Sequence, residues 1–108
     1  MGNRGNDSRR RKLKRMLQQR ESECWLCGFS LDNHAEPFTD LATEVDEEVP
    51  VSLGGDAYGV ETPCHLVHRM CNLKKGNKIL KQGSLREWFI EQQKMRIETQ
   101  AEPTSDWL

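Results

Sequence analysis

The sequence contains no long hydrophobic run. Of its 108 residues, 35% are apolar and 6% are aromatic, and the longest apolar stretches fall far short of what a bilayer requires. Residues 1–20 also lack the apolar core of a secretory signal. These absences argue against a membrane protein and against a secreted protein, and they predict a cytoplasmic location.

Basic residues are missing from the middle of the chain. Residues 21–68 contain eleven acidic side chains and no Lys or Arg, whereas residues 1–20 contain eight basic side chains and one acid. Residues 69–108 contain eight basic and five acidic side chains, so the net charge of −1 conceals a basic arm, an acidic centre and a second basic region. This distribution suits a polyanion-binding protein with a cation site at its centre, although the arm could equally be a solvated tail.

So few apolar residues leave only a small core, and a chain of this length needs an additional constraint to fold stably. The four cysteines are the candidates, namely Cys24, Cys27, Cys64 and Cys71. In a reducing cytoplasm, clustered cysteines bind metal more often than they form disulfides. A redox Cys-x-x-Cys site would need a βαβ setting, which the sequence does not contain.

Two short motifs have the spacing of metal ligands. Cys24-Trp25-Leu26-Cys27-Gly28 is a zinc knuckle, and His68-Arg69-Met70-Cys71 repeats the two-residue gap forty residues later. Together they predict a tetrahedral Cys₃His zinc site made of Cys24, Cys27, His68 and Cys71. A variant site could use Cys64 or His65 in place of His68; otherwise Cys64 is a spare thiol that packs in the core.

The periodicity of apolar residues predicts a small α+β fold. The expected elements are a basic helix over residues 9–21, a strand over 43–50, a second strand over 64–68 and a basic helix over 69–81. A last helix is expected to start at the capping box Ser84-Leu85-Arg86-Glu87. We therefore expect a basic arm and helix over residues 1–21, a zinc-stapled domain over residues 22–82, and a C-terminal helix and tail over residues 83–108.

Two longer stretches resemble a known family. They are Glu-Val-Asp-Glu-Glu-Val-Pro-Val-Ser-Leu-Gly-Gly at 44–55 and His-Leu-Val-His-Arg-Met-Cys-Asn-Leu-Lys-Lys-Gly-Asn at 65–77. Both are similar to the core of the HNH endonucleases, in particular to the small zinc-containing members common in bacteriophages and prophages. The resemblance covers about residues 22–80. It implies a ββα-metal (His-Me finger) core with a structural zinc site and flanking helices, in a bacterial or phage-infected cell.

The resemblance also implies a catalytic centre. Family members cleave DNA with one divalent cation, Mg²⁺ or Mn²⁺, and the matching positions for its ligands are Asp46 and Asn72. Oxygen ligands of this kind suit such a hard cation. Asn72 directly follows the zinc ligand Cys71, so the zinc site is expected to place it.

Two positions depart from the family pattern. Glu47 replaces the usual general-base His, and Pro63 replaces the Asn that normally steadies this base. A carboxylate is a weaker base than a neutral imidazole, so His65 is the candidate substitute. Adjacent strand residues point to opposite faces, so a site that uses both Asp46 and Glu47 implies a distorted strand end.

Nucleic-acid contacts are expected around the second knuckle, from Arg69, Lys74, Lys75 and Lys78. The predicted function is a divalent-metal-dependent DNA endonuclease of the HNH type. One alternative is a zinc-stabilised DNA-binding module without hydrolysis, which the departures at Glu47 and Pro63 favour. A second alternative is an accessory protein that docks on a phage packaging enzyme through its acidic centre.

Overall fold

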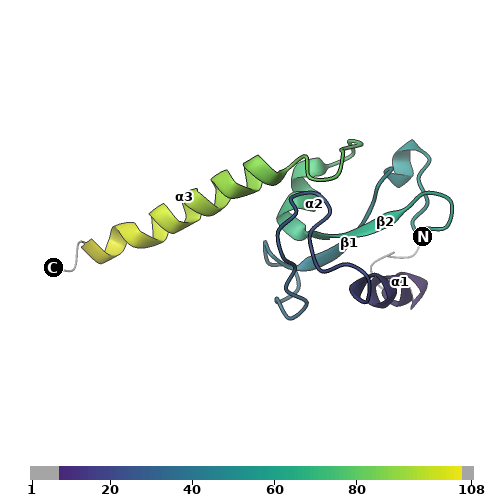
Figure 1. Cartoon of the computed structure of the whole chain (residues 1–108), viewed down its shortest axis with the longest axis horizontal. Helices are drawn as coiled ribbons and strands as arrows, with labels where there is room; N and C mark the ends of the chain where they lie inside the picture. Colours follow the sequence, from purple (N-terminus) through teal and green to yellow (C-terminus); the bar gives the residue numbers. More distant parts are fainter. Residues whose placement is uncertain (1–7, 106–108) are drawn as a thin grey trace.

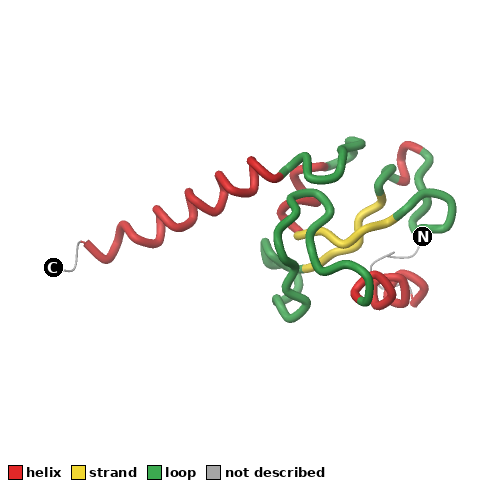
Figure 2. Tube along the Cα trace, viewed as in Figure 1, coloured by secondary structure: helices red, strands yellow, loops and turns green. Residues whose placement is uncertain are grey.

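The computed structural model describes residues 8–105, and the side chains of residues 8–99. They form a small α+β fold with a two-stranded sheet (Figures 1 and 2). Among the described residues, no helix is long and apolar enough to cross a membrane. The elements in chain order are α1 (Ser8–Gln18), β1 (Thr43–Glu47), the 3₁₀ helix η2 (Val51–Leu53), β2 (Cys64–His68), α2 (Arg69–Lys75) and α3 (Arg86–Ser105).

The sheet separates two small cores. β1 and β2 are antiparallel, with Thr43 opposite His68 and Glu47 opposite Cys64. Because strand side chains alternate between faces, Cys64 and Leu66 point to one face, where they pack against Leu17 of α1. Val67 points to the other face and enters a second core between the knuckle, α2 and the start of α3. Figure 1 shows α1 and α2 on opposite sides of the sheet.

The first turn of α3 and the residue just before it belong to this second core. Leu85 and Phe89 are buried there. The backbone N–H of Leu85 donates to the Leu26 carbonyl at 2.8 Å, and that of Gly83 donates to the Trp25 carbonyl at 2.9 Å. These bonds attach the chain to the first knuckle just before α3 begins. Beyond its first turns, α3 extends away from the rest of the molecule (Figure 1).

Four predicted boundaries are wrong by two or more residues. The first helix ends at Gln18 rather than at Glu21. α2 ends at Lys75 rather than Lys81, because Gly76 leaves the helix with a positive φ of 58°. β1 ends at Glu47 rather than at Pro50, which instead caps η2. The last helix begins at Arg86 rather than at Ser84. The predicted strand over residues 64–68 is confirmed.

The turn after η2 explains the two consecutive glycines. Gly54 has a left-handed φ of 97°, which favours glycine. A Cβ on Gly55 would lie 1.6 Å from the backbone oxygen of Val49, so no other residue fits. The following loop is ordered by Asp56, whose carboxylate accepts hydrogen bonds from three backbone N–H groups, those of Tyr58, Val60 and Glu61.

Candidate metal centre

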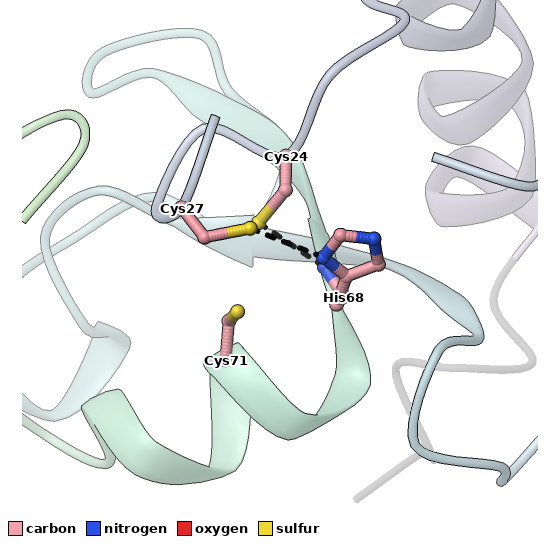
Figure 3. Close-up of side chains that lie close together, drawn as sticks. All are labelled: Cys24, Cys27, His68 and Cys71. Carbon is pink, nitrogen blue, oxygen red and sulfur yellow. Dashed lines mark hydrogen bonds between the residues drawn. The ribbon is translucent and has the colours of Figure 1, made fainter. Parts of the chain in front are cut away.

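Four side chains converge on one point in the second core. The Cys24, Cys27 and Cys71 thiols and the His68 imidazole offer four ligand atoms that all lie within 4.8 Å of one another (Figure 3). No more than 2% of any of these residues is exposed. Cys24 and Cys27 come from the knuckle loop, His68 ends β2, and Cys71 lies in the first turn of α2. The predicted quartet therefore forms a possible metal site.

The backbone of the knuckle presents its two thiols on the same side. The N–H of Gly28 donates to the Cys24 carbonyl at 2.7 Å, and the N–H of Cys24 donates to the Phe29 carbonyl at 2.8 Å. Gly28 has a φ of 82°, a conformation that side-chain-bearing residues rarely adopt. This glycine closes the tight turn and returns the chain toward β2.

The orientation of His68 favours a metal ligand. Its Nε2 lies 3.0 Å from the Ser30 carbonyl, which can only accept, so Nε2 carries the proton. Nδ1 is then the atom that faces the cluster, 3.3 Å from the Cys27 sulfur. A second hydrogen bond that fixes the tautomer is usual for metal-binding histidines. The imidazole also stacks on Phe89, with ring centroids 4.9 Å apart.

The electrostatics of the cluster favour a cation. Hydrogen bonds from Cys27 and Cys71 hold the pKa of the Cys24 thiol far below its ordinary value, and hydrogen bonds with Cys24 and Cys27 raise the pKa of Cys71. Burial lowers the pKa of His68, but its hydrogen bonds with Cys24 and Cys27 outweigh this and raise the pKa to about 10. A divalent ion can replace the protons that these groups share, and three thiolates with one imidazole suit zinc.

Cys64 and His65, the alternatives to His68, lie outside the cluster. Cys64 is buried against Leu17 and Leu66, and burial raises the pKa of its thiol to about 11. His65 stacks flat on Trp25, with ring centroids 4.4 Å apart. Cys64 therefore has the packing role that the sequence predicted for a spare thiol.

The face of β1 that meets α2 carries two carboxylates, each with its own partners. Glu44 accepts from the Arg69 guanidinium at 3.0 Å and from the Asn72 amide at 3.1 Å. Asp46 accepts from the Lys75 ammonium at 3.2 Å, and this ammonium also donates to the Glu47 carbonyl at 2.9 Å. We expected Asp46 to meet Asn72. The structure instead places Glu44 against Asn72 and Asp46 one helical turn further along, against Lys75.

The Asp46–Lys75 pair is inside the protein. Asp46 is 6% exposed and Lys75 is 1% exposed. Burial raises the pKa of the Asp46 carboxyl, although the Lys75 ammonium acts in the opposite direction. Lys75, which we expected to contact phosphate, is thus an internal counter-ion and is not on the surface.

Glu47 points to the opposite face, as strand alternation requires. β1 stays regular as far as Glu47, so the distorted strand end that the resemblance implied is not present. The Glu47 carboxylate pairs with the Arg10 guanidinium of α1 at 2.7 Å. The same guanidinium donates to the Val45 carbonyl at 3.2 Å, so Arg10 fastens α1 to β1.

His65 lies directly across the sheet from Asp46, on the same face. Its Nδ1 is 3.1 Å from the Glu21 carboxylate, and its Nε2 is 2.8 Å from the Glu48 carboxylate. Both ring nitrogens are therefore engaged. Pro63 offers its carbonyl to the Glu48 backbone N–H at 3.0 Å.

Lys74 and Lys78 are exposed, and Arg69 is half-buried beside Glu44. Three residues that organise this region, namely Arg10, Glu21 and Glu44, were not predicted from the sequence. Glu44 had a usable signal, because it lies two residues before Asp46 and so shares its face of the strand. Arg10 and Glu21 contact residues far away in the chain, and no local pattern indicates such contacts.

Comparison with protein-family models found no match, and comparisons with curated proteins and with solved structures found no similar protein. The residues and their geometry therefore carry the functional proposal.

Proposed function

We propose that the chain is a divalent-metal-dependent DNA endonuclease of the HNH type, with zinc held by Cys24, Cys27, His68 and Cys71. The observation that supports this most is the position of the metal cluster. His68 ends β2 and Cys71 lies in the first turn of α2, so a bound zinc ion would fix the β2–α2 junction. The strand, loop, strand and short helix follow one another in the order that the HNH resemblance implies.

The β1–α2 face offers oxygen ligands of the type that a catalytic Mg²⁺ or Mn²⁺ needs. Asp46 and Asn72 would hold the cation, and Glu44, which already contacts Asn72, is a further carboxylate on the same face. Such a cation would supply Lewis-acid stabilisation of the charge that develops on the phosphate. Because Lys75 contacts one Asp46 oxygen, it would hold this carboxylate in place and leave the other oxygen for the cation.

The basic side chains around α2 would position the DNA. Lys74 and Lys78 are exposed, and Arg69 lies beside Glu44 at the start of the same helix. Contacts from these residues to phosphates add affinity that depends on salt and not on base sequence. They would bring a phosphodiester to the carboxylates of β1 without selecting a particular site.

A second candidate is a zinc-stabilised DNA-binding domain that does not hydrolyse DNA. The contacts that the two candidate bases, Glu47 and His65, already make favour this second function. The Glu47 carboxylate is committed to Arg10 on the far face of the sheet, and both ring nitrogens of His65 are engaged by carboxylates. Hydrolysis by this domain requires one of these groups to exchange its partner for water.

Plasmid nicking in the presence of Mg²⁺ or Mn²⁺ distinguishes the two candidates. We expect the wild type to nick supercoiled plasmid and Asp46→Asn to be slower by about 10²-fold or more, because it removes a charged metal ligand. Asn at this position keeps an acceptor for Lys75, which Ala would not. Glu47→His is expected to nick no faster than the wild type, because position 47 lies on the face of β1 opposite to Asp46 and its side chain meets Arg10 of α1.

Asp40→Asn is the matched control, because Asp40 is an exposed carboxylate whose ion-pair partner is Arg96 of α3. It should nick like the wild type. Intact plasmid with every protein and metal, together with retention of the protein on DNA, would favour the binding module. Equal nicking by Asp46→Asn and wild type would remove Asp46 from the metal site.

A further inference from the structure

A cleft of about 600 Å³ lies on the α1 side of β1. One wall is α1, and the other is the loop over residues 33–42 that leads into β1. The start of β1 forms its floor with Thr43, Glu44 and Val45. Figure 1 shows this loop and α1 beside each other below the sheet. Through Glu44, the cleft adjoins the face where Arg69 and Asn72 lie.

The two walls differ in chemistry. From α1 the cleft receives three basic side chains, those of Arg10, Arg11 and Lys14. From the loop it receives apolar surface, mainly Pro37 and Phe38. A basic wall facing an apolar wall matches a ligand with a negative edge and a flat apolar face, and a nucleotide has both.

Phe38 has two properties that a residue serving the fold alone does not need. It is 81% exposed, so it contributes almost nothing to the core. It also has a φ of 68° and is the single non-glycine residue with positive φ among those described. A bulky side chain at positive φ is strained, and such strain is concentrated at functional sites.

The surroundings of Phe38 indicate what would contact it. The Arg69 guanidinium carbon lies 5.6 Å from the centre of the ring, and Arg69 is tied to Glu44. The ring therefore lies beside Arg69 and lines the same cleft as the basic side chains of α1. Aromatic rings in such a setting stack on bases that are not already stacked within a duplex.

We propose that this cleft binds an unpaired strand of nucleic acid, with a base stacked on Phe38 and the adjoining phosphates on Arg11 and Lys14. The inference rests on the proposed function in taking nucleic acid as the ligand. It adds that the protein engages a single-stranded or frayed segment next to the β1–α2 face. A duplex keeps its bases stacked and cannot offer one to Phe38.

The test measures binding of the zinc-loaded full chain to a labelled DNA oligonucleotide of about 12 nucleotides, a length within the usual range for single-strand sites. Binding is also measured to the same oligonucleotide sequence as a DNA duplex and as single-stranded RNA. Fluorescence anisotropy without added Mg²⁺ separates binding from cleavage. We expect Phe38→Asn to weaken single-strand binding by about 5- to 100-fold, the usual effect of losing one stacked base, and to leave duplex binding within about twofold.

Phe38→Asn is chosen because it should fold normally. Asn tolerates positive φ better than other non-glycine residues, and the ring it removes is exposed, so the unfolding midpoint should stay constant or rise. Phe38→Trp should keep single-strand binding, since it keeps the stacking surface. Lys14→Gln should reduce the salt dependence of binding, whereas Lys94→Gln, an exposed lysine on α3, should not.

Unchanged single-strand affinity in Phe38→Asn, or no single-strand binding by the wild type, would overturn the inference. Tighter binding of the RNA oligonucleotide than of the DNA would support the cleft and identify RNA as its preferred strand. Plasmid nicking is measured separately on the wild type. A protein that nicks plasmid but loses nothing with Phe38→Asn would retain the proposed function and lose this inference alone.

Discussion

Removal of zinc is expected to unfold the protein. Three of the eight buried members of the second core belong to the cluster that could hold the metal ion, namely Cys24, Cys27 and Cys71. Without a metal ion, their charges and protons must be accommodated in a buried site, and the knuckle loses its link to the β2–α2 junction. Structural zinc sites of this class contribute about 10–16 kcal/mol, which is as large as the whole stability of a typical domain, about 5–15 kcal/mol. Circular dichroism before and after treatment with a chelator measures the effect.

Substitution of one ligand should reproduce this loss. Cys71→Ser is expected to abolish the cooperative thermal transition and to reduce bound zinc from one equivalent to almost none. Cys64→Ser is the matched control, because Cys64 is buried but lies outside the ligand cluster. It should keep one equivalent of zinc and lose only part of its stability. A cooperative transition in Cys71→Ser equal to that of the wild type would show that the quartet does not stabilise the fold.

Lys75→Met is expected to destabilise the protein by about 3–5 kcal/mol, the usual cost of removing one partner from a buried ion pair. Lys75 is 1% exposed, and its ammonium is the hydrogen-bond donor to both Asp46 and the Glu47 carbonyl. Met fills a similar volume but leaves the Asp46 carboxylate buried without a counter-ion. Denaturant unfolding of the zinc-loaded variant measures the change.

A double variant isolates the contribution of charge. Asp46→Asn combined with Lys75→Met removes both charges, so it should recover much of the stability that Lys75→Met alone loses. Lys74→Met is the matched control one residue away, because Lys74 is exposed, and it should change stability by less than about 0.5 kcal/mol. If Lys75→Met is as mild as Lys74→Met, then Lys75 is not the internal counter-ion described above.

The features that could be predicted from the sequence depend on residues that lie close together in the chain. The two ligand pairs have fixed two-residue gaps. One pair lies in the knuckle loop and the other spans the β2–α2 junction, so each pair presents its side chains together and the quartet could be identified before the fold was known. The strand over residues 64–68 also follows from a short-range pattern. α2 was predicted too long because the charged residues beyond Lys75 are compatible with a helix, and Gly76 ended it through its backbone conformation.

The pairing of charges could not be predicted in the same way. Asp46 was expected beside Asn72, but the partners depend on how β1 lies across α2, and that placement brings Lys75 to Asp46 and Asn72 to Glu44. Glu47 meets Arg10, which is thirty-seven residues earlier in the chain and carries no signal of this contact. The strained backbone of Phe38 likewise arises from the folded loop and not from its neighbours in sequence.

We propose that one zinc ion, held by three thiolates and one imidazole, fixes the junction between β2 and α2. Zinc-edge X-ray absorption on the purified protein can identify the ligands of this ion. The expected spectrum fits three sulfur ligands at about 2.3 Å and one nitrogen ligand at about 2.0–2.1 Å. In His68→Cys, which replaces the one nitrogen ligand, the spectrum should fit four sulfur ligands if the variant still binds zinc. A wild-type protein that contains no zinc, or whose zinc has two sulfur ligands and the rest oxygen or nitrogen, would contradict the account.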